Sequence, residues 1–484
     1  MAERDADSAG RAARGAATTI VGQVAKFAIQ LLGMVVLSRL LIPTDFGYLA
    51  MIMAIIGVAN VLGDFGLSLA AIQAKRLTEA QKTNLFWVNT GIGALLALLA
   101  WLLAGPIAAG FGEPKLVGAT QVLAVVFLVN GLMAQFRVEL TRRLRFRLLA
   151  LGEVVSQAAA LVIAVGAALA GAGYWSLVLQ QVAIPVTLLA IYAAFSAWKP
   201  SRRQRNGSVR PFIGFSVSTT AVQLVNYVSA NVHSVVIGRW MGAADLGLFT
   251  RGFQIFMLPL QQIASPLTRV MLPVLSQRFG TPDYARYLLR IQTVLVYAVG
   301  SALTYLAVAG RPLVIVGLGD RWEPSGFVVQ ILAIGGIFQT LGYLYYWIFL
   351  SSARMQVLLI CEVVGRAFLI LFVVVAARNG IEAVAIGYSA GLFMIWLITT
   401  CFGTKRVPDI GTRDLLLVAL RAGTIFAVTI GLCQILTSSI QSLEPFAQAV
   451  VYLAVELSVF GAAALIPAVR RDYIAVADTA RRML

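Results

Sequence analysis

Apolar runs of about twenty residues recur along the whole chain and are separated by short polar gaps. About 20 apolar residues in a helix cross the 30 Å core of a bilayer, so each run is long enough to span a membrane. The composition agrees with this interpretation, because 60% of the 484 residues are hydrophobic and only 12% are charged, about half the charged fraction of a soluble domain. No alternation typical of membrane β-strands is present. The sequence therefore predicts an all-α membrane protein.

About fourteen transmembrane helices are predicted. The expected spans are residues 17–40, 47–72, 85–110, 116–136, 151–170, 173–197, 212–238, 246–275, 288–310, 325–350, 355–377, 382–403, 414–437 and 446–468. They predict the following organisation: an N-terminal tail (1–16), a six-span N-lobe (17–198), a basic linker (199–211), a six-span C-lobe (212–404), two further spans (405–469) and a C-terminal tail (470–484).

The chain is strongly basic, with 38 Lys and Arg against 21 Asp and Glu and a net charge of +17. In a membrane protein this excess indicates topology, because Lys and Arg are concentrated in cytoplasmic loops. With the N-terminus inside, about 27 of them fall in cytoplasmic segments and about six in the outer loops. We therefore expect both termini in the cytoplasm, basic loops against anionic lipid head groups, and no nucleic acid partner.

The sequence contains an internal repeat. Residues 23–47 align with residues 223–247 without a gap, and Leu149–Val155 aligns with Leu358–Val364. Six spans separate the copies, so both copies enter the membrane from the same side and the halves are parallel repeats. Parallel repeats are related by an axis along the membrane normal, which places a substrate cavity between two lobes. The repeat therefore predicts two parallel six-helix lobes around a central cavity that works by alternating access.

Several motifs resemble a known family of transporters. Val36–Leu49 (VLSRLLIPTDFGYL) and Gly63–Gln73 (GDFGLSLAAIQ) resemble the start of the polysaccharide transporter family. Asp245–Arg251 (DLGLFTR), Leu258–Ser276 and Leu318–Trp322 (LGDRW) resemble the corresponding part of its second lobe. The resemblance covers about residues 15 to 405, and its motifs are structural rather than chemical.

This resemblance implies a Wzx-like flippase of the multidrug/oligosaccharidyl-lipid/polysaccharide exporter superfamily. Such proteins move undecaprenyl-pyrophosphate-linked oligosaccharide repeat units across the cell inner membrane for lipopolysaccharide O-antigen, capsule or exopolysaccharide biosynthesis. The family's cavity is cationic and is formed mainly by the first two spans of each lobe. Besides this substrate and membrane lipids, a polysaccharide polymerase and the chain-length machinery are candidate partners. No cofactor is implied, and coupling to H⁺ or Na⁺ stays open.

Lys26 lies mid-way along the first span, where an ionisable side chain must face a cavity or a partner on another helix. Contact with the substrate and a structural ion pair are both open. The expected partner is Asp64, because the two residues lie at similar depths on either side of the turn near residue 43. Asp64 is also a candidate site for a coupling proton or sodium ion, although its GDFG motif is equally typical of a helix end.

Arg251 is a candidate ligand for the pyrophosphate group, because a guanidinium binds phosphate with two parallel hydrogen bonds and stays charged. The alternative is that its side chain extends to the membrane interface. Arg269 is a weaker candidate, since its place near the cytoplasmic end of its span suits a topology anchor.

Polar side chains recur at matched positions of the first span of each lobe and suit a sugar-binding cavity or polar helix packing. They are Gln23, Gln223, Asn226 and Tyr227, with the chain's one histidine, His233, on the same helix.

Glu153 and Glu362 occupy equivalent repeat positions, and we interpret them as structural carboxylates near helix starts. Arg366 follows Glu362 by one turn and can pair with it. The basic clusters Arg142–Arg147 and Lys199–Arg210 are expected to set topology and contact lipid, with recruitment of a glycosyltransferase as the alternative.

Other functions are disfavoured by the residues present. An exporter of small molecules or drugs in the same superfamily is the main alternative, but organic cations require acidic cavities and the intramembrane charges here are mostly basic. A membrane polysaccharide polymerase or ligase needs catalytic groups in outer loops, which are short here, so no enzyme and no catalytic residue is expected. The three cysteines have no metal-binding spacing, and no G-x-x-x-x-G-K-[ST] motif for ATP is present.

Overall fold

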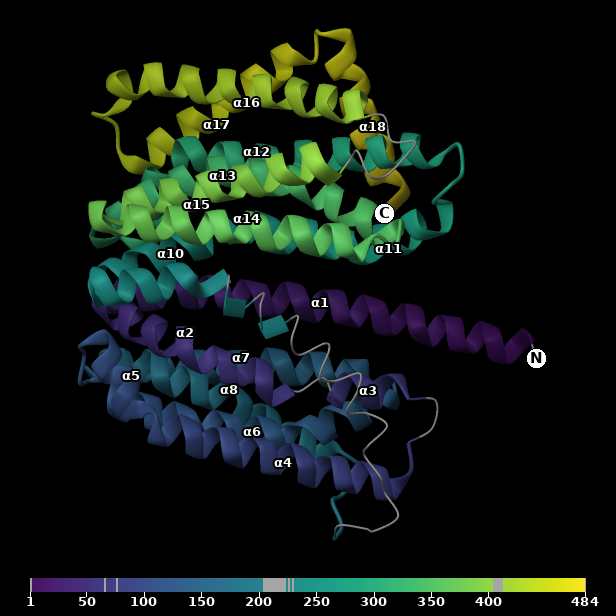
Figure 1. Ribbon diagram of the computed structural model, residues 1–484, viewed down its shortest axis with the longest axis vertical. Coiled ribbons are helices and arrows are strands. Elements are labelled where there is room, and N and C mark those ends of the chain that lie inside the picture. The colour runs from purple at the N-terminus through teal and green to yellow at the C-terminus, as the bar shows by residue number, and fades with distance from the viewer. Residues whose placement is uncertain are drawn as a thin grey trace. The chain divides into compact units, whose positions relative to one another are not determined.

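The computed structural model is all-helical over the part of the chain that it describes (Figure 1). It describes the backbone of residues 2–64, 67–74, 77–202, 223–224, 227–228, 230–403 and 412–483. Within these ranges, the side chains of residues 2–20, 60, 61, 63, 64, 69, 73, 265, 266, 269, 270, 403, 412, 480, 482 and 483 lie outside the description. The chain divides into two compact units, residues 1–247 and 248–484.

Unit 1 contains the first eight helices. They are α1 (Ala2–Leu40), α2 (Pro43–Asp64), α3 (Leu67–Gln73), α4 (Glu79–Leu102), α5 (Ala104–Phe111), α6 (Leu116–Arg142), α7 (Phe146–Leu169) and α8 (Tyr174–Phe195). Within this unit α6 packs against α4 and α8, and α7 packs against α1 and α8. Residues 230–240 are also helical, and α10 (Ala243–Pro259) starts in this unit.

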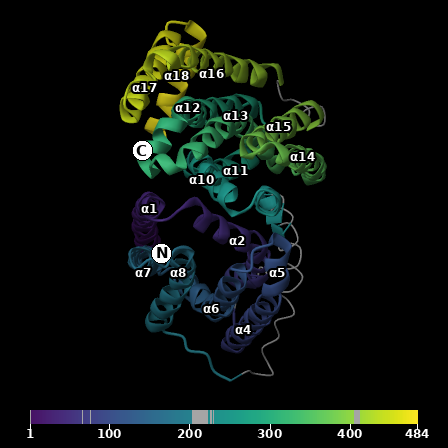
Figure 2. The same cartoon turned by 90° about the vertical axis from the view of Figure 1, so that its left-hand side faces the viewer.

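Unit 2 continues α10 and contains the remaining helices. They are a π-helical segment (Leu260–Ala264), α11 (Ser265–Arg278), α12 (Tyr284–Leu318), α13 (Glu323–Ser351), α14 (Met355–Ala376), α15 (Ile381–Ile398), a second π-helical segment (Thr399–Gly403), α16 (Thr412–Ile440), α17 (Pro445–Ala463) and α18 (Pro467–Met483), with short 3₁₀ turns at Asp320–Trp322 and Ala377–Asn379. Within this unit α12 packs against α13, α16, α17 and α18 (Figure 2).

The predicted linker lies mostly outside the described residues, so the lobe boundaries stay a prediction.

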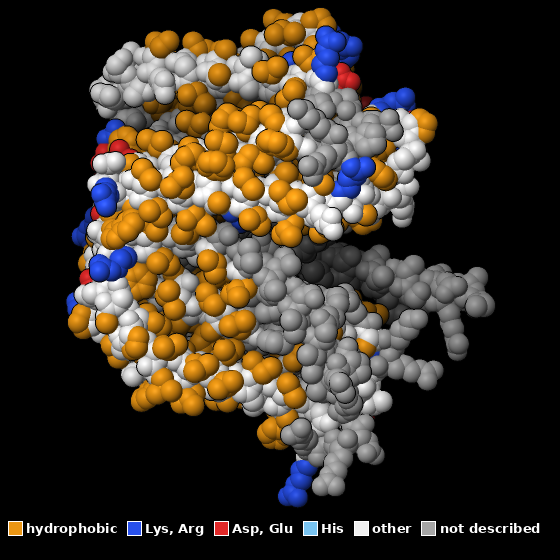
Figure 3. Space-filling view, viewed as in Figure 1, with side chains coloured by type: hydrophobic (Ala, Val, Ile, Leu, Met, Phe, Trp, Pro, Cys, Tyr) orange, Lys and Arg blue, Asp and Glu red, His pale blue; other side chains and the backbone are white. Residues whose placement is uncertain are grey.

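Eleven helices in the described ranges are long and apolar enough to cross a membrane. Hydrophobic side chains cover the helix flanks on the face drawn in Figure 3, and Lys and Arg side chains gather near the helix ends. This distribution suits lipid around the helices and water at their ends. The chain is therefore a multi-pass membrane protein, as its composition predicts.

In the described part of the chain, the third, eighth and twelfth predicted spans are not continuous α-helices. The eighth span, expected at 246–275, consists of α10, a π-helical segment and α11. Pro259 and Pro266 flank that π-helical segment. Each lacks the N–H group that would donate to the carbonyl four residues earlier, and this loss explains the local change of hydrogen bonding. The third span is also divided, into α4 and α5.

The turn between α1 and α2 packs against its repeat counterpart through two glycines. A Cβ atom at Gly47 would lie 1.7 Å from the carbonyl oxygen of Ala243, and one at Gly247 would lie 1.8 Å from that of Pro43. These two contacts are equivalent, because Pro43 aligns with Ala243 and Gly47 with Gly247. The contact therefore requires glycine at both positions, and the two copies of the sequence repeat meet in a symmetric way.

The second aligned stretch has the same backbone geometry in both units. Leu144, between α6 and α7, and Ala353, between α13 and α14, adopt left-handed conformations with φ of 54° and 56°. The amides of Arg145 and Arg354 then donate across the turn to carbonyls five residues earlier, at 3.0 and 2.9 Å. Two residues other than glycine in this conformation at equivalent positions confirm that the sequence repeat is a structural repeat.

A buried ion-pair network joins α4 to α6. The Lys82 ammonium lies 2.9 Å from the Glu139 carboxylate, which also binds Arg143, and 2.8 Å from the exposed Glu79 carboxylate. The Glu139 side chain is only 2% exposed. A buried carboxylate persists as an ion only when cations and hydrogen bonds replace its water, so this network stabilises the contact between the two helices.

Arg142 has a local structural role. Its Nη1 atom donates to the carbonyl oxygens of Ala71, Ile72 and Ala74 at 2.8, 3.1 and 2.7 Å. These carbonyls lie at the C-terminal end of α3 and have no partner within that helix. The sequence interpretation of Arg142–Arg147 as a topology and lipid-binding cluster therefore misses the capping role of Arg142 and the Glu139 contact of Arg143.

Gly47→Ala should destabilise the folded protein, because the added methyl group overlaps a backbone carbonyl and the two turns must separate. We expect a loss of about 1–3 kcal/mol, as in other overpacked sites, measured as a lower thermal unfolding temperature in detergent. Gly91→Ala is the matched control, since nothing lies within 4 Å of its Cβ position in α4. An equal effect of both substitutions would contradict the close contact.

Glu139→Gln should also lower stability, because it leaves the buried Lys82 ammonium with only the exposed Glu79 carboxylate. Removing one partner of a buried ion pair costs on the order of 3 kcal/mol. Glu79→Gln is the control, because the Glu79 side chain is 70% exposed and exposed pairs contribute little. The same detergent unfolding measurement should separate the two variants, and identical unfolding temperatures would argue against the network.

Candidate functional site

Lys26 and Glu153 form an ion pair between α1 and α7 in unit 1. The Lys26 Nζ atom lies 3.1 Å from the Glu153 Oε2 atom. Their side chains are 31% and 24% exposed, so both groups are partly shielded and still reachable from outside the protein. Lys26 was expected either in an ion pair or facing a cavity. In the structure it has an ion-pair partner and also lines a cavity.

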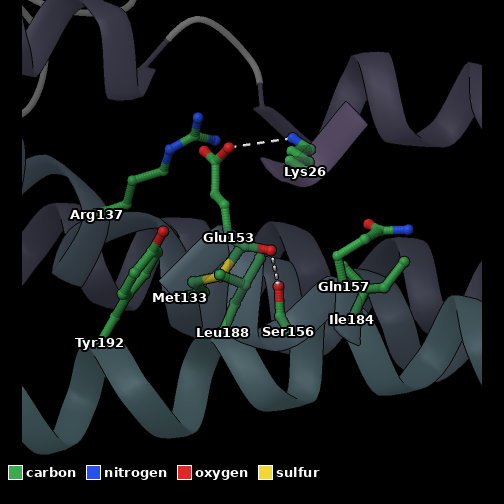
Figure 4. Close-up of a pocket in the computed structure, with 9 residues that line it drawn as sticks. All are labelled: Lys26, Met133, Arg137, Glu153, Ser156, Gln157, Ile184, Leu188 and Tyr192. Carbon is green, nitrogen blue, oxygen red and sulfur yellow. Dashed lines mark hydrogen bonds and ion pairs between the residues drawn. The ribbon is translucent and has the colours of Figure 1, made fainter. Parts of the chain in front are cut away.

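This cavity of about 180 Å³ is lined by four helices of unit 1 (Figure 4). Its lining residues are Lys26 from α1, Met133 and Arg137 from α6, Glu153, Ser156 and Gln157 from α7, and Ile184, Leu188 and Tyr192 from α8. In Figure 4 the Arg137 guanidinium and the Lys26 ammonium lie on either side of the Glu153 carboxylate. Two cations and one carboxylate give the cavity a net positive charge, so it favours anions.

Close packing of α7 and α8 holds Glu153 in place. A Cβ atom at Gly152 would lie 2.6 Å from the Tyr192 ring, so glycine allows that ring to approach the helix. The buried Tyr192 hydroxyl donates to the Leu149 carbonyl oxygen at 3.2 Å, which fixes the ring against the first turns of α7. The position of the carboxylate therefore depends on this aromatic contact.

Unit 2 has an equivalent carboxylate with a different partner. Arg366 donates from Nε to Glu362 Oε2 at 2.9 Å on the same helix, α14. This contact confirms the pair expected from their spacing. The residue of α7 equivalent to Arg366 is Gln157, which cannot supply a charge. Glu153 instead takes its cation from α1, a contact that local spacing could not reveal.

Arg251 lies inside unit 2 and is held by protein groups. It is 8% exposed, its Nη1 atom donates to Gln254 Oε1 at 2.7 Å, and its guanidinium lies over the Trp322 ring at 6.0 Å from the centroid. Its assignment to the pyrophosphate stays a prediction.

The matched polar positions of the first and seventh spans have different environments. Gln23 and Gln223 are exposed, and His233 is only 3% exposed. The Tyr227 hydroxyl donates to the Met53 carbonyl oxygen of α2 at 2.6 Å, and a Cβ atom at Gly57 would clash with that hydroxyl. Tyr227 therefore packs against α2 with its hydroxyl already bonded.

Three predicted site residues cannot be placed by their side chains. The side chains of Asp64 and Arg269, and the whole of Asn226, lie outside the described residues. The expected Lys26–Asp64 pair is therefore untested, and Glu153 is the partner that the structure shows for Lys26. Among the described residues, no group of three or more His, Cys, Asp or Glu side chains could hold a metal ion.

Comparison with curated proteins finds relatives of similar length. The lipopolysaccharide biosynthesis protein WzxC of Escherichia coli (strain K12) is 25% identical over 393 residues, which cover 80% of this chain and 78% of that protein. The succinoglycan biosynthesis transport protein ExoT of Rhizobium meliloti (strain 1021) is 24% identical over 325 residues, 66% of this chain and 65% of that protein.

Comparison with solved structures identifies the fold. The lipid II flippase MurJ in an inward closed conformation matches with a TM-score of 0.69 and 13% identity, over 91% of this chain and 98% of that chain. The predicted all-helical membrane fold is thereby confirmed. The model of the polysaccharide biosynthesis protein family matches residues 36–326, more than half of the chain. This chain therefore belongs to the polysaccharide biosynthesis protein family.

Proposed function

We propose that this protein is a flippase that moves undecaprenyl-pyrophosphate-linked oligosaccharide repeat units across the cell inner membrane for surface polysaccharide biosynthesis. The observation that carries this proposal is the cationic cavity of unit 1, where Lys26 and Arg137 lie beside Glu153 inside a helical bundle. It is supported by the family, by the names of WzxC and ExoT, and by the MurJ-like fold. The protein is a transporter and not an enzyme.

The Lys26–Glu153 pair suggests how a pyrophosphate is bound and released. Lys26 is already neutralised by a carboxylate, so a phosphate oxygen must replace Glu153 at the ammonium. Arg137 can then contact the same phosphate group, because it lines the same cavity. When the substrate leaves, Glu153 returns to Lys26. Because a charged partner is present in both states, neither state contains an isolated ammonium in a partly shielded site.

The cavity is large enough to enclose only part of the substrate. Its volume of about 180 Å³ is below the range typical of sites that enclose a drug-sized ligand, about 300–1,000 Å³. It therefore suits the charged phosphate end, while the sugars and the lipid chain occupy other surfaces. A cationic site also disfavours an exporter of organic cations.

The proposed topology has both termini in the cytoplasm, in agreement with the distribution of Lys and Arg. A polysaccharide polymerase and chain-length proteins are the proposed partners, because flipped repeat units must be joined on the outer side of the membrane. The proposed function also includes coupling of transport to H⁺ or Na⁺. It further includes binding of the pyrophosphate group by Arg251 and Arg269.

Deletion of the gene should cause undecaprenyl-pyrophosphate-linked repeat units to accumulate, because assembled units no longer reach the outer leaflet. Extraction of lipids and mass spectrometry measure this accumulation, and expression of the wild-type chain should reverse it. Intact surface polysaccharide with no accumulation, in a strain without a second flippase, would contradict the proposal and favour an exporter of small molecules.

Lys26→Ala should lower flipping about tenfold or more, the loss expected from one charge-assisted hydrogen bond worth about 1.5–3 kcal/mol. Lys26→Arg should retain part of the activity, since it keeps the charge. The matched control is Lys199→Ala, because Lys199 is an exposed lysine outside the cavity. Flipping is measured with purified variants in vesicles, with folding checked by gel filtration. Equal activity of Lys26→Ala and Lys199→Ala would show that Lys26 is only structural.

A further inference from the structure

Glu456 is a buried carboxylate near the middle of α17. It is 5% exposed, and its Oε2 atom is buried and accepts no hydrogen bond from any described residue. A carboxylate at membrane depth is costly unless a partner or a cavity accommodates it, and such groups are usually functional. The position of Glu456 therefore needs an explanation that helix packing alone does not give.

Three other water-shielded carboxylates in the described spans are each held by a cation. Glu139 binds Lys82, Glu153 binds Lys26, and Glu362 binds Arg366. A carboxylate beside a Lys or Arg side chain stays ionised, because the neighbouring charge favours its charged form. Glu456 differs, since no lysine or arginine forms an ion pair with it in the described part of the chain.

The titratable groups that face Glu456 come from the two helices packed against α17. They are Tyr305 of α12 and Cys433 of α16, both of which interact with it electrostatically. Neither group is a cation, and the Tyr305 hydroxyl already donates to the Ala449 carbonyl oxygen at 3.2 Å. A carboxyl group with no cation beside it at membrane depth is less costly in its neutral form than in its charged form.

A large cavity within unit 2 reaches the same depth. Its volume is about 890 Å³, and it lies between α12, α13, α16 and α17. Cys433, which faces Glu456, lines this cavity, and so does Tyr452, one helical turn before Glu456 on the same face of α17. The cavity therefore extends to the immediate surroundings of the carboxylate.

The lining of this cavity can hold water. Four glutamines and a threonine contribute polar groups: Gln330, Gln434, Gln441, Gln448 and Thr437. Water needs several polar partners in a space of sufficient size, and both conditions are met here. Water in this cavity would connect the end of the helices with the surroundings of Glu456.

We propose that Glu456 is a proton-binding site that couples transport to the proton gradient, with the unit 2 cavity as its access path. This proposal rests on the proposed transport function. When Glu456 binds a proton, α17 can pack in a dry contact against α12 and α16. When it releases the proton to water in the cavity, the charged carboxylate must be hydrated and this contact must loosen. Proton binding thus favours one packing of the C-terminal helices over another.

A proton fits the site better than a sodium ion. A metal cation needs several oxygen ligands around it, whereas Glu456 is the one carboxylate at this position among the residues that the structure describes, and the hydroxyl of Tyr305 is already bonded. A single unpaired carboxyl group can bind a proton without further ligands.

The test compares Glu456→Gln with Glu444→Gln. Glu444 is the control because it is an exposed residue at the N-cap of the same helix, α17. The full-length protein is reconstituted in vesicles with a lipid-linked oligosaccharide, and flipping is measured with and without an imposed pH gradient. The wild type and Glu444→Gln should be accelerated by the gradient. Glu456→Gln should lose this acceleration completely and flip at one rate in both conditions, because glutamine cannot release a proton.

The outcomes separate the two proposals. No flipping by the wild type under any gradient overturns the flippase function. Three other results overturn the role of Glu456. The wild type flips without a response to the pH gradient, Glu456→Gln responds as strongly as the wild type, or only a sodium gradient accelerates flipping. A second readout does not depend on flipping: the infrared band of a protonated carboxylic acid should disappear at high pH in the wild type and be absent from Glu456→Gln.

Discussion

A charged side chain shielded from water by apolar helices is stable only if another group replaces its hydration, and this constraint explains most of the polar architecture of the protein. Lys82 and Arg143 surround Glu139 at the contact of α4 with α6, and Lys26 neutralises Glu153 between α1 and α7. These two pairs differ in access to solvent. The Glu139 side chain is 2% exposed, whereas Glu153 is 24% exposed beside a cavity. The ion pair of Glu139 therefore holds two helices together away from solvent, whereas the ion pair of Glu153 is accessible to solvent.

Close contacts of the backbone supply the second requirement, because helices in lipid gain little from hydrophobic association and depend on packing. Gly47 and Gly247 allow two repeat-related turns to touch through their carbonyl groups. Gly152 has a similar effect at the functional site, since it admits the Tyr192 ring against α7. The cation-lined cavity thus depends on small residues that carry no charge. The packing of these helices within unit 1 sets the geometry of the cavity.

The all-helical membrane fold and most helix positions follow from hydropathy alone, because a bilayer requires a nearly fixed length of apolar helix. The divided third and eighth spans were not predicted, since hydropathy does not report where a helix is interrupted. The same distinction applies to the site. The Glu362–Arg366 pair is a local i, i+4 contact and was predicted, but Glu153 lies 127 residues from Lys26 and only the folded chain brings them together. The repetition of Glu153 at Glu362 was the available signal that this carboxylate mattered.

Paired and unpaired carboxylates suit different tasks in a transporter. A carboxylate held by a lysine can exchange that partner for a phosphate group, but its own charge stays constant through the exchange. A carboxylate without a cation can change its charge by binding a proton, and it is a poor site for an anion. Glu153 and Glu456 have these two environments in separate units of the chain. In the proposed function, the exchange of partners therefore belongs to unit 1 and the change of charge to unit 2.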